Sequence, residues 1–409
     1  MSSAGDVLVL SKREAGGVGL IGTQLRRLGL RPVLVSALPD DRYRAYCDEH
    51  VLLDWDTESL EDLLLRLKER GIEPVAVVNL VEPLIPWQIA LAEQFGLPGA
   101  SSGLAVLLSK LLVRRQMRES GLSPMRFTGG PAARLTEDEL AEGGPTFFPA
   151  IAKPSQDSGG SRWVRRVDSP EELAAYQREL TEAGLSAMEI VVEEYLEGTE
   201  FSVDGPVLRG GFTPLFVVEK PFHDEQRHHD SGIRVSPPQN ARVAAAVGAF
   251  GPVLDALCTD LGLDRCWLHV EGRVLRDGTV GLIEINPRPG GGMYQSATIR
   301  TCGIDPVGTA VLMALPGFDP GTLGSVRRST ETVGLLDIET TRTGRVRVET
   351  PEAELKALPG VLDCYLDEDD FTSAHEENFF AGFLLGGEDL PELQEAERRV
   401  RATLRYTVE

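Results

Sequence analysis

The sequence predicts an α/β protein that opens with a parallel sheet and continues into further domains. Short apolar segments rich in Val and Leu recur near the N-terminus, at residues 7–10, 33–35, 51–53 and 75–80. Before the fourth segment, residues 58–70 have leucines at helical spacing: Leu60, Leu63, Leu64 and Leu67. Short buried strands that alternate with helices are typical of a parallel sheet. At roughly 100–200 residues per domain, 409 residues indicate two to four domains.

The composition and the charge exclude several classes of protein. The 42% hydrophobic and 25% charged residues are ordinary for a soluble globular chain. Lys plus Arg number 41 and Asp plus Glu number 63, which gives a net charge of −22. So acidic a chain is a poor candidate for broad binding to nucleic acid or anionic membranes. A local basic pocket for an anionic ligand remains compatible with it.

The cysteines and the apolar segments predict a cytoplasmic location. No stretch approaches the roughly 18 unbroken apolar residues of a membrane span, and residues 1–6 lack the pattern of a signal peptide. The cysteines are odd in number and scattered, without a Cys-x-x-Cys pair, which is typical of reduced thiols. They are Cys47, Cys258, Cys266, Cys302 and Cys364.

After residue 100 the pattern predicts two further domains, with boundaries at 101–320 and 321–409. We expect one helix from a cap at Ser101 or Ser102 to about Glu119, and a capped helix opening at Asp168-Ser169-Pro170. Strands are expected at 150–153, 163–167, 190–195, 200–203 and 215–218, then a polar loop at 221–238 and a helix at 242–261. A hairpin over 267–275 and 280–286 turns at Asp277-Gly278. The last part is strand-rich and ends in a helix over 392–405, which predicts a small α+β domain.

A glycine motif after the first strand has two interpretations. Gly17–Gly22 spells G-x-G-x-x-G, the pattern of a dinucleotide-binding turn. Such a site needs an acidic residue at the end of the second strand, which here ends at Val35-Ser36. The sequence therefore favours a glycine-rich turn from strand to helix that lines a cleft. A nicotinamide-dependent oxidoreductase stays open as the alternative.

Two lysines occur in settings that suit phosphate. Lys153 ends an apolar strand and precedes the small-residue loop 155–161, whose backbone N–H groups can approach phosphate oxygens closely. Lys110 lies in the helix before it. A solvated surface lysine is the alternative for each, and the apolar strand before Lys153 weakens it.

The segment 191–200 combines an apolar strand with a run of acids. Its extended backbone can present N–H and C=O groups to an adenine edge, and a carboxylate further on can hold ribose hydroxyls. An exposed acidic strand edge is the alternative, and this segment alone does not exclude it.

The predicted hairpin carries three oxygen-bearing side chains. Glu284 and Asn286 occupy alternate positions of one strand and share a face, and Glu271 on the neighbouring strand can face them. Such ligands suit a hard cation, Mg²⁺ or Mn²⁺, that bridges phosphates. Surface glutamates are the alternative. Arg288 and the glycines 290–292 follow at once, which indicates an anion site where charge develops during reaction.

In this order, these elements resemble the ATP-grasp superfamily of carboxylate–amine ligases over roughly residues 6–315. The C-terminal part is similar to that of L-amino-acid ligases, which form dipeptides. The resemblance implies an α/β ATP-grasp fold with an N-terminal pre-ATP-grasp domain at 1–100. It implies ligation of amino-acid-like substrates through an acyl phosphate, with release of ADP and phosphate. The implied cofactors are ATP and two Mg²⁺ ions. Neither nucleic acid nor membrane is an expected partner, and a homodimer is left open.

The resemblance also implies a role for individual residues. The expected ATP-binding residues are Lys110, Lys153, Ser158, Gly159, Gly160, Glu193, Tyr195, Leu196 and Glu200. Glu271, Glu284 and Asn286 are the expected metal ligands, and Arg288 the catalytic residue. The substrate would contact Glu82, His229, Arg288 and Gly291.

Alternatives remain at several of these positions. Glu82 could instead be a helix N-terminal acid. The segment 223–230, rich in His and acids, could be a substrate lid, a metal site or a solvated loop. For the whole chain, the alternatives are an ATP-grasp ligase for a non-amino-acid carboxylate, the oxidoreductase, or a nucleotide-binding module without catalysis.

Overall fold

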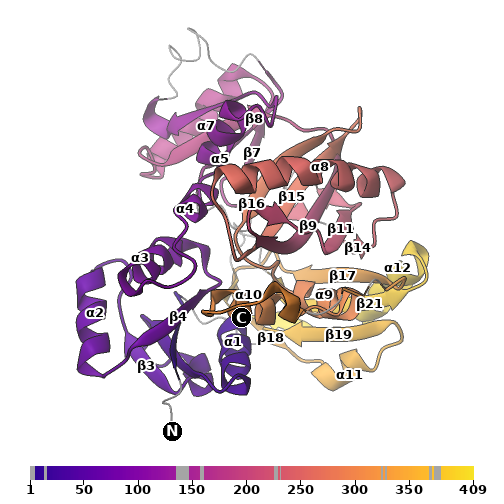
Figure 1. Ribbon diagram of the computed structural model, residues 1–409. Helices are drawn as coiled ribbons and strands as arrows, with labels where there is room; N and C mark the ends of the chain where they lie inside the picture. The colour runs from indigo at the N-terminus through magenta and orange to yellow at the C-terminus, as the bar shows by residue number, and fades with distance from the viewer. Residues whose placement is uncertain are drawn as a thin grey trace.

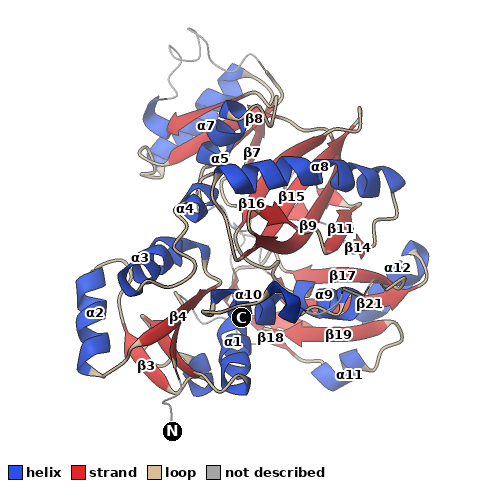
Figure 2. Ribbon diagram, in the orientation of Figure 1, coloured by secondary structure: helices blue, strands red, loops and turns tan. Residues whose placement is uncertain are grey.

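The computed structural model describes residues 5–12, 16–134, 147–156, 161–224, 229–230, 232–323, 326–327, 329–367, 371–372 and 379–409. The chain forms a parallel-sheet unit at its N-terminus, a small lobe, and a large sheet to which the C-terminal residues contribute (Figure 1). Figure 2 shows how the helices and strands are distributed among these parts.

The N-terminal unit is the predicted parallel sheet. Its order is β3-β2-β1-β4, and every pair in it is parallel. The strands are β1 (Asp6–Leu10), β2 (Arg31–Ser36), β3 (Glu49–Leu52) and β4 (Pro74–Asn79). They alternate with α1 (Gly16–Arg27), η1 (Arg42–Tyr46), α2 (Leu60–Glu69), η2 (Glu82–Leu84) and α3 (Ile85–Phe95). A capping box between Ser59 and Asp62 starts α2, which buries Leu63 and Leu67.

The glycine motif does not form the turn that the sequence predicts. Gly17, Gly19 and Gly22 lie inside helix α1. A Cβ on Gly22 would lie 2.3 Å from the backbone oxygen of Tyr46, so only glycine lets α1 approach η1 this closely. The motif therefore serves helix packing, and the interpretation of these glycines as a turn was wrong.

The small lobe is an antiparallel sheet of order β5-β8-β6-β7 covered by α7 (Pro170–Glu182). Its strands are β5 (Phe127–Pro131), β6 (Ala150–Pro154), β7 (Arg165–Val167) and β8 (Glu189–Glu194), and η3 (Ala132–Arg134) follows β5. The predicted cap at Ser169 is confirmed. The single helix expected up to Glu119 is instead two, α4 (Gly103–Leu107) and α5 (Lys110–Glu119), because Ser109 caps a new helix there. The strand expected from residue 163 begins at Arg165, since Trp163 has a φ of 59°.

The large sheet follows the order β16-β15-β9-β11-β14-β17-β21-β19, with β10 paired to β9. Its members are β9 (Gly198–Leu208), β10 (Gly211–Phe212), β11 (Phe216–Lys220), β14 (Arg234–Ser236), β15 (Cys266–Leu275), β16 (Val280–Asn286), β17 (Thr332–Glu339), β19 (Val361–Leu366) and β21 (Phe379–Gly387). The predicted hairpin is confirmed as β15–β16. The predicted loop at 221–238 was wrong in part, because it contains β14 and the short pair β12 (His223–Asp224) and β13 (His229–Asp230).

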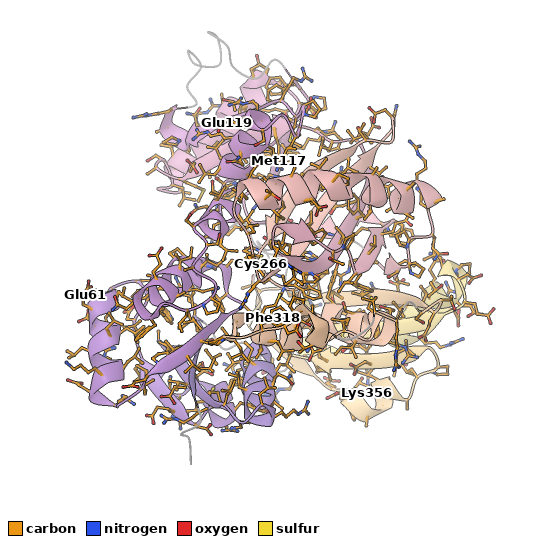
Figure 3. All side chains as sticks on the ribbon, viewed as in Figure 1. Glu61, Met117, Glu119, Cys266, Phe318 and Lys356 are labelled. Carbon is orange, nitrogen blue, oxygen red and sulfur yellow. The ribbon has the colours of Figure 1, made fainter. Side chains whose placement is uncertain are left out.

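Helix α8 (Ala241–Asp260) covers the large sheet. Its length and composition would also suit a membrane span. Its buried residues Val243, Phe250 and Leu257 belong to the largest core cluster, together with Val270 of β15. This is the packing of a core helix. Figure 3 shows Met117 of the same core enclosed by side chains and Glu61 at the periphery.

The C-terminal residues contribute strands to the large sheet. β14 pairs with β17, and β17 pairs with β21, so one sheet runs across the predicted boundary at 320. A separate sheet joins β18 (Gly344–Val348), β20 (Phe371–Thr372) and β22 (Tyr406–Val408). The helices are α9 (Tyr294–Cys302), α10 (Pro306–Ala314), η5 (Pro320–Leu323), α11 (Glu352–Lys356) and α12 (Leu390–Thr403). The predicted final helix is confirmed.

Candidate active site

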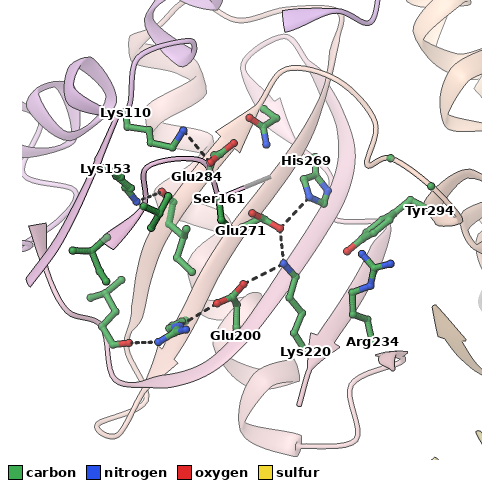
Figure 4. Close-up of a pocket in the computed structure, with 18 of the residues that line it drawn as sticks. Lys110, Lys153, Ser161, Glu200, Lys220, Arg234, His269, Glu271, Glu284 and Tyr294 are labelled. Carbon is green, nitrogen blue, oxygen red and sulfur yellow. Dashed lines mark hydrogen bonds and ion pairs between the residues drawn. The ribbon is translucent and has the colours of Figure 1, made fainter. Parts of the chain in front are cut away.

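A cavity of about 380 Å³ is lined by the small lobe, the large sheet and the C-terminal strands. It brings together Lys110, Lys153, Glu193, Tyr195, Leu196, Glu200, Glu271, Glu284, Asn286, Arg288 and Gly291 (Figure 4). Ser158, Gly159 and Gly160 lie outside the described residues. His229 belongs to β13, where its backbone pairs with Asp224. Most of the predicted site residues therefore meet in one cavity, although their roles stay predictions.

The β15–β16 hairpin has the geometry that the sequence predicts. Glu271 lies opposite Glu284 across the ladder, and His269 lies opposite Asn286. Glu284 forms an ion pair with Lys110 at 3.0 Å. Burial raises the pKa of Glu284, but the charges of Lys110 and Lys153 together bring the pKa below its ordinary value.

Lys153 lies in a buried cluster with two other charged side chains. It bonds Glu193, which also accepts from Arg114 Nε at 2.8 Å. Burial lowers the pKa of Lys153, and the Glu193 carboxylate opposes this without reversing it. Burial raises the pKa of Glu193, but Arg114 and Lys153 bring it below its ordinary value. The carboxylate of Glu193 therefore faces two cations.

The segment between β8 and β9 follows the small-lobe strand that carries Glu193. The N–H of Tyr195 donates to the backbone oxygen of Pro149 at 3.0 Å, and the oxygen of Leu196 accepts from Arg273 at 2.9 Å. These two backbone groups are thus engaged within the protein.

Lys220 joins two of the predicted carboxylates. Its Nζ lies 3.1 Å from Glu200 and 2.6 Å from Glu271. Glu200 also accepts from Arg273 Nε at 3.1 Å. Burial raises the pKa of Glu271, yet Lys220 and His269 lower it well below its ordinary value. This wall of the cavity is a chain of alternating charges.

His269 is held behind Glu271 by a second carboxylate. Its Nδ1 lies 2.6 Å from Asp204, its Nε2 lies 3.4 Å from Glu271, and its ring meets Tyr294 edge-on at 5.0 Å. Burial lowers the pKa of His269, but Asp204 and Glu271 together outweigh burial and raise the pKa to about 9. The imidazole is therefore cationic at neutral pH.

Arg288 links the cavity to the N-terminal unit. Its Nε donates to Glu82 at 2.6 Å, and its Nη1 donates to the oxygen of Pro289 at 3.0 Å. Glu82 begins the short helix η2, as the interpretation as a helix N-terminal acid expects, and its role toward a substrate stays a prediction. In the loop after Arg288, the N–H of Gly290 donates to Asp204 at 2.8 Å. This bond connects the loop to the carboxylate that also holds His269.

The sequence interpretation missed several residues of the site. They are Arg114, Asp204, Lys220, Arg234, His269, Arg273, Tyr294, Asp337, Tyr365 and Phe379. For two of these residues, the sequence contains a feature that could have identified them. Lys220 ends an apolar strand as Lys153 does, and Arg114 lies four residues after Lys110 on one helix face. Arg234 and Asp337, which form an ion pair, come from a predicted loop and a predicted separate domain, and nothing local connects them.

The predicted metal ligands fit a hard cation by their chemistry. Glu271 and Glu284 supply carboxylates and Asn286 supplies an amide oxygen from the same cavity. Across the described ranges, no three side chains of His, Cys, Asp or Glu gather as a metal cluster. A cation here would thus depend on the amide, on two carboxylates and on oxygens of the substrate.

Comparison with known proteins identifies the central part of this chain. Residues 146–297 match the model of the ATP-grasp domain. The carbamoyl phosphate synthase large chain of Deinococcus deserti is 32% identical over 171 residues, which is 41% of this chain. This chain spans 16% of that protein's length.

Solved structures match the whole chain in fold. An L-amino acid ligase from Bacillus licheniformis has a TM-score of 0.81 and 19% identity, with 100% of each chain covered. N5-carboxyaminoimidazole ribonucleotide synthetase from Thermotoga maritima has a TM-score of 0.70 and 16% identity, covering 99% of this chain and 100% of its own.

A third solved structure is a complex with nucleotide. The biotin carboxylase domain of the Hydrogenobacter thermophilus 2-oxoglutarate carboxylase, in complex with MgADP, has a TM-score of 0.72 and 15% identity, covering 100% of this chain and 92% of its own. The predicted α/β fold class and the predicted resemblance are confirmed. The chain contains an ATP-grasp domain at residues 146–297 and shares the fold of these solved structures along its length.

Proposed function

We propose that this protein is an ATP-dependent ligase that joins the carboxylate of one amino-acid-like substrate to the amine of another. One observation carries the proposal: each of the two carboxylates suited to a metal is neutralised by a lysine of the same cavity. Lys110 pairs with Glu284 at 3.0 Å, and Lys220 pairs with Glu271 at 2.6 Å. A metal–triphosphate can replace both pairs, because its cation takes the carboxylates and its phosphates take the ammonium groups.

The lysines and Arg288 would do different work in the reaction. Lys110 and Lys153 would orient the triphosphate, since phosphoryl transfer depends on positioning and electrostatics. A carboxylate oxygen of the first substrate attacks the γ-phosphorus, and the bond to the β–γ bridging oxygen breaks to release ADP. The amine nitrogen then attacks the acyl carbon, and phosphate departs with the proton that the nitrogen loses. Arg288 would stabilise the oxyanion that forms in between.

Glu271, Glu284 and Asn286 would hold Mg²⁺, which supplies charge neutralisation on the transferring phosphate. Lys110 and Lys220 neutralise the two carboxylates in the present structure. With the cation bound, their ammonium groups become available to anionic oxygens of the substrates.

Two ion pairs support amino acids as the substrates. Arg288 pairs with Glu82 on one side of the cavity, and Arg234 pairs with Asp337 on another. Each pair sets a guanidinium beside a carboxylate, which complements the opposite charges of a zwitterion. The similarity to the Bacillus licheniformis L-amino acid ligase supports the same substrate class.

The test is product analysis by mass spectrometry. Wild-type protein is incubated with ATP, Mg²⁺ and a mixture of amino acids, beside the matched variant Glu284→Gln. We expect ADP and a product whose mass equals two amino acids less one water, in the wild-type reaction only. ADP release without a condensed product, or an equal yield from the variant, would contradict the proposal.

A ligase for a non-amino-acid carboxylate is the second candidate. It is favoured by the likeness to the biotin carboxylase domain and to the N5-carboxyaminoimidazole ribonucleotide synthetase. Bicarbonate in place of the first amino acid separates the two. ADP release that requires bicarbonate would support the second candidate.

A further inference from the structure

Helix α5 carries a second cation, Arg114, which bonds both the small lobe and the large sheet beside the cavity. Arg114 lies one turn after Lys110, is 2% exposed, and is directed into the interior. Its Nε donates to Glu193 of β8 at 2.8 Å. Its Nη2 donates to the backbone oxygens of Leu282 and Ile283 on β16, each at 2.8 Å.

These three acceptors belong to different parts of the site. Glu193 is the carboxylate that holds Lys153. Leu282 and Ile283 directly precede Glu284, the carboxylate that Lys110 holds at 3.0 Å. A single guanidinium therefore connects the strand of Glu193 in the small lobe to the strand of Glu284 in the large sheet.

We propose that Arg114 is a positioning residue that sets the distance between the phosphate-binding lysine Lys153 and the metal-binding strand of Glu284. The inference rests on the proposed function. Arg114 would not touch ATP, because it is 2% exposed and is not among the residues that line the cavity. It would act by holding Lys153 and Glu284 where a phosphate and its cation can be bound together.

The shape of the Arg114 guanidinium allows a test of whether Arg114 acts by positioning its partners or only by its positive charge. A guanidinium offers planar donors in a fixed fork, whereas a lysine ammonium is a point charge on a flexible stem. Arg114→Lys keeps the charge but cannot reach a carboxylate and two carbonyls at once. Misplacement of reacting groups by about 1 Å can cost roughly 10²-fold in rate. We expect kcat of Arg114→Lys to fall by about 10- to 100-fold.

The test compares three proteins by calorimetric ADP binding and by ATP turnover. They are the wild type, Arg114→Lys and Val113→Ala; the last shortens the neighbouring buried side chain on the same helix and controls for loosened packing. ADP affinity is measured without and with saturating Mg²⁺. We expect Mg²⁺ to strengthen ADP binding in the wild type and in Val113→Ala, and to strengthen it several-fold less in Arg114→Lys.

The outcomes separate this inference from the proposed function. Equal Mg²⁺ enhancement in all three proteins would overturn the positioning role, as would equal losses in Arg114→Lys and Val113→Ala. A wild type that binds Mg²⁺ and ADP but ligates nothing would refute the ligase and leave the binding test decisive. If Arg114→Lys does not fold, Glu193→Ala removes the acceptor of Arg114 Nε from the other side and should also weaken the Mg²⁺ enhancement.

Discussion

The two walls of the cavity differ in how their charges are balanced. On the small-lobe side, with helix α5, Lys110, Arg114 and Lys153 outnumber the single carboxylate Glu193 at the core of the cluster. On the large sheet, the carboxylates Glu200, Glu271 and Glu284 are balanced by Lys220 and Arg273. An excess of cations suits phosphate, and a row of carboxylates suits a metal.

The difference explains how an acidic protein can hold a polyanion. The net charge of −22 belongs to the whole chain, whereas the anion site needs only a few cations held in low dielectric. Both walls meet in the pair between Lys110 and Glu284. Substitutions on the two walls should therefore have distinct effects.

The largest effect is expected on the acidic wall. Glu284→Gln removes a charge from the proposed metal site while keeping the shape of the side chain. Because metal neutralisation is worth several kcal/mol, kcat should fall by roughly 10³-fold or more. Steady-state ADP release at saturating Mg²⁺, with circular dichroism to check the fold, measures it. Wild-type turnover in this variant would contradict the metal-binding role of Glu284 and of the wall that carries it.

The next largest effect is expected at Arg288, where the acidic wall meets the N-terminal unit. Arg288→Ala should reduce kcat by roughly 10²–10³-fold, because such donors act mainly in the transition state. ATP binding, which we assign to Lys110 and Lys153, should change far less. Arg288→Lys keeps the positive charge but loses the planar pair of donors of the guanidinium, so its activity should remain far below that of the wild type. Near-normal ligation by Arg288→Lys would mean that Arg288 only neutralises Glu82.

A pH-dependent effect on stability is expected from His269. Its folded pKa of about 9 exceeds the ordinary 6.5, so its contribution is complete below pH 6.5 and is lost as pH rises through 9. The stability difference between the wild type and His269→Asn should shrink over that range by about 3 kcal/mol. Denaturant unfolding measured from pH 6 to pH 9 tests this.

His50 provides the matched control. Burial lowers the pKa of His50, so the unfolded state binds its proton more readily and its contribution should rise with pH. Opposite slopes are thus expected from His269→Asn and His50→Asn. Equal slopes would show that Asp204 does not hold a buried imidazolium beneath the acidic wall.

The smallest effect is expected at the C-terminal side of the cavity. Arg234→Met removes the guanidinium that pairs with Asp337. If this pair binds the amine substrate, KM for that substrate should rise by roughly 10- to 100-fold, the value of a charged hydrogen bond. KM for ATP should stay close to the wild-type value, since the cations facing phosphate lie on the other wall. An equal rise in both constants would indicate a general loss of cavity shape.

The sequence predicts the parts of the site that depend on short-range order. The β15–β16 hairpin combines a turn signal with alternating positions, so the pattern of residues alone is enough to set Glu271, Glu284 and Asn286 on one face. The parallel sheet is predictable for the same reason, because its strands alternate with helices along the chain.

Other features depend on contacts that no local pattern encodes. Arg234 and Asp337 lie 103 positions apart in the chain and meet only because β14 pairs with β17. The glycine motif misled because the same spacing serves a turn or a close helix contact, and the backbone of Tyr46 decides between them. Glu193 is an expected ATP-binding residue, and its carboxylate bonds Arg114 and Lys153; Lys153 is brought to it by the pairing of β6 with β8, which no local pattern encodes.

The most direct test of the account follows the oxygen atoms of the carboxylate substrate. Amino acids labelled with ¹⁸O in the carboxyl group are incubated with the protein, ATP and Mg²⁺, and the released phosphate is analysed by mass spectrometry. An acyl phosphate transfers one carboxylate oxygen to phosphate, so we predict one ¹⁸O per molecule of phosphate in each turnover. Phosphate that carries no label while a condensed product forms would contradict the account.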